Sequence, residues 1–200
     1  MDSEVAAWRR QQRTLLLAKR EAMPQEARQH AAHAVVARLN KHVAAEGHAS
    51  LGLYWPIKHE INLLSWAQAL AQQSHVTLCL PVVVKRQAPL EYWRWQHGEP
   101  LATGVWNIPV PTRREVVLPE LMLAPLVGFD RENYRLGYGG GYFDRTLASL
   151  QRRPAVIGIG YEYAALDSIF PQSHDIPMDA VVTEQRCTLS DDGGNHDTGS

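Results

Sequence analysis

Four of the five residues from 137 to 141 are glycine, and charged side chains flank this segment on both sides. Because glycine has no side chain, the backbone N–H groups of such a loop could surround phosphate oxygens. Arg135 precedes the loop as a permanent, fork-shaped cation. Asp144 follows it, in the first turn of an expected helix whose N-terminus would favour a bound anion. The same glycines would also suit a tight turn that needs positive φ, so both readings stay open.

The glycine segment matches neither of two common nucleotide-binding motifs. It is not a Walker A loop, because no Gly-Lys-Ser/Thr follows it. It is not a complete dinucleotide fingerprint either, because Tyr142 stands at the third glycine position, and the sequence Gly158-Ile159-Gly160 is equally incomplete. The loop is therefore a candidate anion site without a motif-based assignment.

Helical and strand-like segments alternate along the chain and would position this loop. Helical patterns cover residues 4–22, 24–45, 61–73 and 142–150. Strand-like runs cover residues 51–55, 76–80, 90–95, 121–127, 156–159 and 180–182, whereas 98–119 should be mostly loop and Pro81 should end the second strand. The alternation predicts a three-layer, Rossmann-like α/β domain with a mostly parallel sheet flanked by helices. Ligands bind such sheets at the carboxyl ends of the strands, where run 121–127 leads into the glycine segment.

Composition bounds the possible partners. With 45% hydrophobic and 20% charged residues, the chain should fold as one globular domain over residues 1–187, followed by a disordered tail over 188–200. A net charge of −1 predicts no nucleic-acid or membrane partner, and no apolar run reaches the roughly 18 residues of a membrane span. Cys79 and Cys187 form no disulfide or zinc pattern. We expect a cytoplasmic monomer.

A family resemblance sharpens the reading of the glycine segment. The sequence RLGYGGGYFDRTL (135–147) closely resembles the signature of 5-formyltetrahydrofolate cyclo-ligases. The family's order is also kept by a basic first helix and the blocks LYWPIKHEI (53–61), WNIPVP (106–111), PLVGFD (125–130) and HDIPMDAVVTE (174–184). The resemblance covers nearly the whole chain except the tail.

The resemblance implies a reaction and a set of site residues. The formyl oxygen of 5-formyltetrahydrofolate attacks the γ-phosphate of ATP, the co-substrate; nitrogen 10 then closes the ring to 5,10-methenyltetrahydrofolate, and phosphate leaves. Arg135 and Asp144 would be catalytic, and Asp144 and Asp179 would bind Mg²⁺. ATP would contact Arg9, Arg13, Arg135, Leu136, Gly137, Tyr138, Gly139, Gly140, Gly141, Tyr142 and Phe143. The folate would contact Trp55, Glu60, Trp106 and Tyr142.

Without the resemblance, each of these residues has a simpler interpretation. The first-helix arginines would form a solvated basic face, Glu60 a helix-start charge, Trp55 a core aromatic and Asp179 a loop acid.

The chain also departs from the family pattern at several positions. Phe143 lacks the hydroxyl of a tyrosine, Tyr138 and Gly140 stand where some members are basic, and Arg9 replaces a frequent lysine. Asn133 replaces a glycine but tolerates the same left-handed conformation. Two alternatives therefore remain: a non-catalytic folate- or nucleotide-binding paralogue, and a related α/β enzyme acting on sugar phosphates.

Overall fold

The computed structural model describes residues 3–43 and 47–188. Four α-helices are present in this part of the chain: α1 (Ser3–Glu21), α2 (Gln25–His42), α3 (Leu64–Ser74) and α4 (Tyr142–Ser149). The main sheet contains β1 (Ser50–Gly52), β2 (Thr77–Val82), β3 (Glu91–Arg94), β6 (Leu121–Pro125), β9 (Ala155–Ile159) and β10 (Ala180–Val182). The expected end of the second helix near residue 45 and almost all of the expected tail lie outside the described residues.

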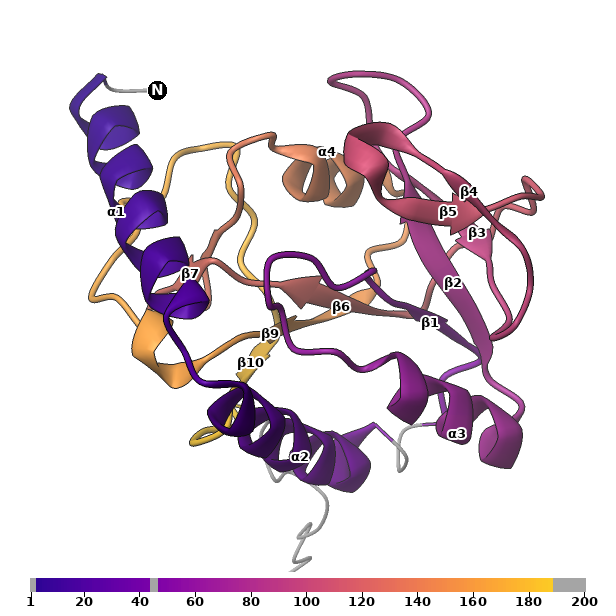
Figure 1. Ribbon diagram of the computed structural model, residues 1–200. Helices are drawn as coiled ribbons and strands as arrows, with labels where there is room; N and C mark the ends of the chain where they lie inside the picture. The colour runs from indigo at the N-terminus through magenta and orange to yellow at the C-terminus, as the bar shows by residue number, and fades with distance from the viewer. Residues whose placement is uncertain (1–2, 44–46, 189–200) are drawn as a thin grey trace, which may run out of the picture.

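The six-stranded sheet has the order β10-β9-β6-β1-β2-β3. All neighbouring strands are parallel except β2 and β3, which are antiparallel. The fold class predicted from the alternation of helices and strands is therefore confirmed. In Figure 1, α2 and α3 lie below the sheet and α4 lies above it, and β6 points towards α1.

The central strand β6 shows why two helical layers are needed. Successive side chains of a strand point to opposite faces. Leu121 and Leu123 accordingly join the core cluster that contains α2 and α3, whereas Met122 and Ala124 join the cluster with Phe143 and Leu147 of α4. The first four residues of β6 are at most 1% exposed. A strand buried on both faces reads as a continuous apolar run, which is how this segment appears in the sequence.

Several predicted boundaries were wrong: the strand expected over 51–55 ends at Gly52, and the helix expected over 61–73 begins at Leu64. Strand β2 continues through Pro81 to Val82, because β1 pairs with it only as far as Cys79 and the missing N–H removes no bond on that side. Segment 98–119 is mostly loop, as predicted, but it also contains a short hairpin. This hairpin consists of β4 (Leu101–Thr103) and β5 (Pro109–Pro111), joined through the 3₁₀ turn η1 (Val105–Asn107). Run 121–127 ends as a strand at Pro125, and a second hairpin follows it.

This second hairpin leads into the glycine segment. It pairs β7 (Gly128–Phe129) with β8 (Arg135–Leu136). The Asp130 carboxylate holds the turn, since Oδ1 accepts the N–H groups of Glu132 and Tyr134 at 3.1 and 3.0 Å. Asn133 has φ +61°, so the left-handed conformation predicted for it is confirmed. A 3₁₀ turn, η2 (Glu162–Ala164), follows β9.

None of the helices described in 3–43 and 47–188 is long and apolar enough to cross a membrane.

Candidate functional site

The glycine loop connects β8 to α4 beyond the carboxyl end of β6. Gly139 and Gly141 have φ of +95° and +63°, which side chains disfavour. A Cβ on Gly137 would lie 2.7 Å from Nη1 of Arg135, and one on Gly140 would lie 2.8 Å from the Tyr142 ring. Positive φ therefore favours glycine at positions 139 and 141, and at 137 and 140 the absent side chains leave room for Arg135 and the Tyr142 ring.

Two arginines border the loop. Nε of Arg13 donates to the carbonyl of Gly137 at 2.6 Å. The Arg135 guanidinium, 11% exposed, donates to the carbonyl of Pro125 at 3.3 Å and lies 3.8 Å from the Asp144 carboxylate. Burial lowers the pKa of Arg135, and burial together with Arg9 and Arg135 lowers the pKa of Arg13. These cations crowd one another, so a bound anion would relieve their repulsion.

The Arg9 guanidinium contacts the segment from residue 169 to residue 175. Its Nε and Nη2 donate to the carbonyls of Ile169 and Phe170, both at 2.9 Å, and Nη2 lies 2.6 Å from Oδ2 of Asp175. The residue is 4% exposed. Asp175 also accepts the N–H of Gln172 at 2.7 Å. The guanidinium is thus occupied in holding segment 169–175, and its predicted contact with ATP stays a prediction that this geometry does not favour.

Glu60 lies next to the glycine loop and is 8% exposed. Its Oε2 accepts the N–H of Ile57 at 2.9 Å, and its Oε1 accepts the hydroxyl of Tyr138 at 2.9 Å. Burial raises the pKa of Glu60, although both hydrogen bonds act in the opposite direction. The backbone of Tyr138 belongs to the glycine loop, but its side chain is directed to the side predicted to bind folate.

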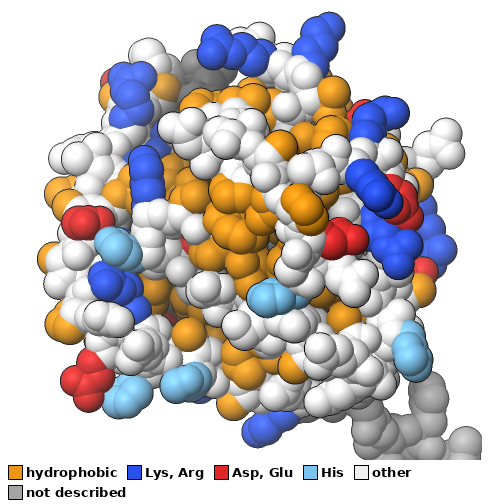
Figure 2. All heavy atoms as spheres, turned by 45° about the vertical axis from the view of Figure 1, so that its right-hand side comes forward, with side chains coloured by type: hydrophobic (Ala, Val, Ile, Leu, Met, Phe, Trp, Pro, Cys, Tyr) orange, Lys and Arg blue, Asp and Glu red, His pale blue; other side chains and the backbone are white. Residues whose placement is uncertain are grey.

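Trp106 and Tyr142 form an aromatic pair beside the loop. Trp106 is 62% exposed, has φ +56° and meets the Tyr142 ring edge-on at 5.4 Å between centroids. The guanidinium of Arg145 lies 5.0 Å from the centre of the Tyr142 ring. In Figure 2, which turns the right-hand side of Figure 1 forward, hydrophobic side chains gather across the middle of the face, with Lys and Arg mostly towards its rim. An exposed, strained tryptophan is poorly explained by core packing and well suited to stack on a ligand.

The remaining predicted aromatic and apolar contacts belong to the core or pack against it. Phe143 is 7% exposed and packs in the α4 cluster, with the Arg135 guanidinium 4.7 Å from its ring centre. Leu136 is 1% exposed in a third cluster, which also contains Leu16 of α1. Trp55 is half-buried and packs edge-on against Trp95, with 6.5 Å between ring centroids. Phe143 and Leu136 are thus core side chains, and Trp55 packs against the core; their predicted ligand contacts stay predictions.

The two predicted magnesium ligands contact different partners. Asp144 is 16% exposed, and its Oδ1 accepts the N–H of Ile176 at 3.2 Å. Asp179 lies at the start of β10, where its carboxylate pairs with Arg153 at 2.6 Å and accepts the N–H of Val156 at 2.7 Å. Within residues 3–43 and 47–188, no group of three or more His, Cys, Asp or Glu side chains is arranged to hold a metal ion. Asp144 could share a magnesium ion with phosphate oxygens and water. The Asp179 carboxylate is engaged by Arg153 and a backbone N–H, and its role as a second magnesium ligand stays a prediction.

The sequence analysis did not predict Arg20 or Arg145 as site residues. Arg20 is 1% exposed; its Nη2 donates to the carbonyl of Leu126 and its Nη1 to the hydroxyl of Tyr138 at 3.4 Å. Arg145 donates to the carbonyl of Gly140. No sequence signal distinguishes Arg20 from the other basic residues of α1, because a helical pattern does not show which charges will be buried.

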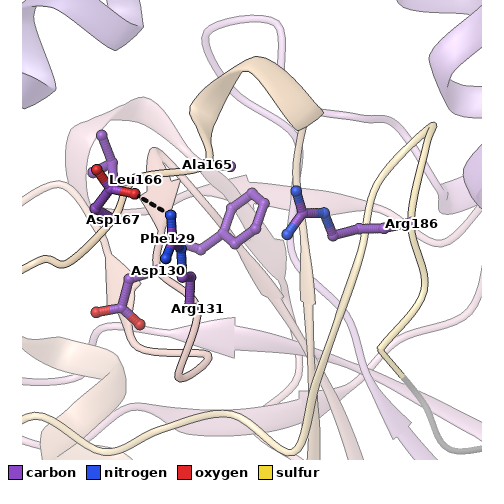
Figure 3. A pocket seen from close by; sticks show the side chains of 7 residues that line it. All are labelled: Phe129, Asp130, Arg131, Ala165, Leu166, Asp167 and Arg186. Carbon is purple, nitrogen blue, oxygen red and sulfur yellow. Dashed lines mark hydrogen bonds and ion pairs between the residues drawn. The ribbon is translucent and has the colours of Figure 1, made fainter.

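Two cavities lie away from these residues. One of about 340 Å³ is lined by Phe129, Asp130, Arg131, Ala165, Leu166, Asp167 and Arg186. Figure 3 shows Arg131 bonded to Asp167 in this cavity, with Arg186 reaching towards the Phe129 ring from the opposite side. The other, of about 430 Å³, lies at the amino ends of β1, β2 and β6. Neither contains a residue that the sequence assigned to the site.

Comparison with known proteins addresses the whole chain. Residues 5–184 match the sequence profile of the 5-formyltetrahydrofolate cyclo-ligase family. A 5-formyltetrahydrofolate cyclo-ligase of Mycolicibacterium smegmatis is 29% identical over 184 residues, covering 88% of this chain and 93% of that protein. One from Haemophilus influenzae is 28% identical over 161 residues, covering 77% of this chain and 81% of that protein.

A solved structure supports the same relation. The 5,10-methenyltetrahydrofolate synthetase of Aquifex aeolicus superposes with a TM-score of 0.78 and 26% identity, covering 96% of this chain and 99% of that one. The profile match spans far more than half of the sequence and includes the glycine loop, Glu60 and Trp106. This chain belongs to the 5-formyltetrahydrofolate cyclo-ligase family.

Proposed function

We propose that this protein uses ATP to convert 5-formyltetrahydrofolate into 5,10-methenyltetrahydrofolate, with release of ADP and phosphate. One contact carries the proposal: the hydroxyl of Tyr138, in the glycine loop, donates to Glu60 at 2.9 Å. The candidate phosphate loop and the candidate folate carboxylate therefore lie one side chain apart. A reaction that transfers a phosphoryl group to the formyl oxygen needs such proximity of its two substrates.

The residues around the loop suit a reaction that depends on position and charge. The formyl oxygen attacks the γ-phosphate, nitrogen 10 attacks the activated formyl carbon, and phosphate departs. Arg13, Arg135 and the loop N–H groups would neutralise the charge on the phosphates. We assign no nucleophile to the protein, since the reacting atoms all belong to the two substrates.

The folate would lie on the other side of Tyr138. The carboxylate of Glu60 can accept N–H groups of the pterin, and a buried carboxylate makes stronger hydrogen bonds than an exposed one. Trp106 and Tyr142 offer ring faces for the flat parts of the substrate. Trp55 remains a candidate contact only through its exposed edge, because it also packs against Trp95.

Magnesium enters the proposal through Asp144 alone. Magnesium commonly takes one carboxylate together with phosphates and water, and the Asp144 carboxylate lies 3.8 Å from Arg135, in the helix that directly follows the loop. No step is assigned to the ion. We also propose a cytoplasmic monomer with a single domain over residues 1–187, as composition and the extent of the profile match suggest.

The test is to mix the protein with 5-formyltetrahydrofolate, ATP and magnesium and to follow the near-ultraviolet absorbance of the conjugated methenyl product. A rise that requires both substrates is the expected result. Folded protein that gives no product but binds either substrate would support the non-catalytic paralogue. Displacement of bound ATP by a sugar phosphate, without any effect of the folate, would support the sugar-phosphate enzyme instead.

A further inference from the structure

A chain of two hydrogen bonds links α1, the glycine loop and the turn that carries Glu60. Nη1 of Arg20 donates to the Tyr138 hydroxyl at 3.4 Å, and that hydroxyl donates to Oε1 of Glu60 at 2.9 Å. A cation stands at one end and a carboxylate at the other, so each bond polarises the next in the same direction. Arg20 is 1% and Glu60 is 8% exposed, so water screens this arrangement weakly.

Arg20 is held in place independently of Tyr138. Its Nη2 donates to the carbonyl of Leu126, directly after β6, and its guanidinium lies 5.8 Å from the centre of the Tyr161 ring. Its Nε has no hydrogen-bond partner among the described residues. A buried cation fixed to the end of the central strand therefore sets the position of the hydroxyl.

Tyr138 is the more accessible member, at 38% exposed. The Nζ of Lys58 lies 5.4 Å from its ring centre, which holds the ring against the same turn as Glu60. Oε2 of Glu60 is fixed by the N–H of Ile57. The hydroxyl of Tyr138 thus supplies the second of two contacts that fix the plane of the Glu60 carboxylate.

We propose that Tyr138 is a positioning residue for the folate-binding carboxylate: supported by Arg20, it fixes and orients Glu60 from within the phosphate loop. The inference rests on the proposed function and goes beyond the predicted ATP contact of Tyr138. The tyrosine at this loop position would thus support folate binding rather than phosphate binding.

The pKa of the Glu60 carboxyl is sensitive to its contact with the Tyr138 hydroxyl. The charged and titratable groups that face it are Arg20 of α1, Tyr138 and Arg135 of the loop region, and Tyr54. Burial raises the pKa of Glu60, and the bond from Tyr138 counters this rise. Removing the hydroxyl should therefore raise the Glu60 pKa further, whether or not any substrate is present.

The experiment compares Tyr138→Phe with Tyr134→Phe, a hydroxyl deletion in the adjacent hairpin. The first readout is a ¹³C NMR titration of glutamate carboxyls without ligands, with the Glu60 signal assigned by its loss in Glu60→Gln. We expect Glu60 to titrate at higher pH in Tyr138→Phe and unchanged in Tyr134→Phe. The second readout is kinetics: Tyr138→Phe should raise KM for 5-formyltetrahydrofolate roughly tenfold, the effect of one hydrogen bond to a charged group, and leave KM for ATP nearly unchanged.

The outcomes separate the two proposals. An unchanged Glu60 titration, a lower KM for the folate, or a rise confined to KM for ATP would overturn the role of Tyr138. If the unmodified protein forms no methenyl product while the Glu60 titration still shifts in Tyr138→Phe, the proposed reaction fails but the positioning contact stands.

Discussion

Replacing Arg9 by methionine should damage the fold far more than the ATP site. The substitution removes the guanidinium partner of the Asp175 carboxylate, which is 8% exposed and keeps His174, at 3.8 Å, as a potential cation. It also removes the donors to the carbonyls of Ile169 and Phe170. Breaking a buried ion pair by removing one partner costs about 3–5 kcal/mol. Typical domains have only about 5–15 kcal/mol of stability, so the loss should be readily measured.

The assay is urea unfolding, followed by tryptophan fluorescence. Trp8 is a local reporter, because its ring meets Phe170 edge-on at 4.8 Å between centroids, within the segment that Arg9 holds. Arg10→Met, an exposed neighbour on the same helix, is the matched control and should change the free energy of unfolding by less than about 0.5 kcal/mol. Arg13→Met should instead raise KM for ATP, since Arg13 borders the glycine loop.

The result that would refute this reasoning is specific. If Arg9→Met unfolds within about 1 kcal/mol of the unmodified protein and raises KM for ATP as much as Arg13→Met does, Arg9 contacts phosphate and the Asp175 pair contributes little. A double-mutant cycle with Asp175→Asn provides a second check. A coupling energy near zero would show that the two side chains do not act as a pair.

Three further predictions concern the site itself. Asp144→Asn should stay folded but lose at least ~10²-fold in activity, because the carboxylate would hold a magnesium ion whose charge neutralisation at the phosphates is worth several kcal/mol. Near-normal turnover at limiting magnesium would contradict this. Because burial raises the folded pKa of Glu60 above its ordinary 4.5, ionising it costs stability. The free energy of unfolding of the unmodified protein, relative to Glu60→Gln, should therefore fall as pH rises above 4.5 through the folded pKa, and a constant difference in urea unfolding across that range would exclude the effect. Trp106→Ala should raise KM for 5-formyltetrahydrofolate while changing the free energy of unfolding by less than about 0.5 kcal/mol, whereas a large loss of stability with unchanged KM would identify Trp106 as a packing residue.

Local patterns predicted the fold well where one physical rule dominates. The apolar run at β6 is buried on both faces, and its alternation assigns Leu123 and Met122 to different layers. The prediction failed at Pro81, where tertiary context decides whether a missing N–H matters, and in the hairpin of β4 and β5, whose three-residue strands are too short to show a period. Asn133 was predictable because only a few residue types tolerate its conformation.

The site was less predictable, because residue type does not show what a side chain faces. Leu136 and Phe143 lie within the signature segment, yet both point into the core. Conversely, Tyr138 leaves the loop for Glu60, a contact between positions 78 residues apart that no local pattern contains. Asp179 is an acid in a block that resembles the family pattern, but its carboxylate already contacts Arg153 and a backbone N–H.

The first helix shows the physical origin of this limit. Arg9, Arg13 and Arg20 are spaced by four and seven residues and so share one face of α1. A sequence reading assigns a basic face to solvent, yet Arg9 and Arg20 are among the most buried residues of the helix and Leu15 is 55% exposed. Arg9 donates to the carbonyl of Ile169, Arg13 to that of Gly137 and Arg20 to that of Leu126. These carbonyls lie in loops and at strand ends, where regular secondary structure supplies no donor. Buried carbonyls require donors, and guanidinium groups supply several while remaining charged. The basic face of α1 therefore binds the loops at the carboxyl edge of the sheet. A bound phosphate could relieve the repulsion among its arginines.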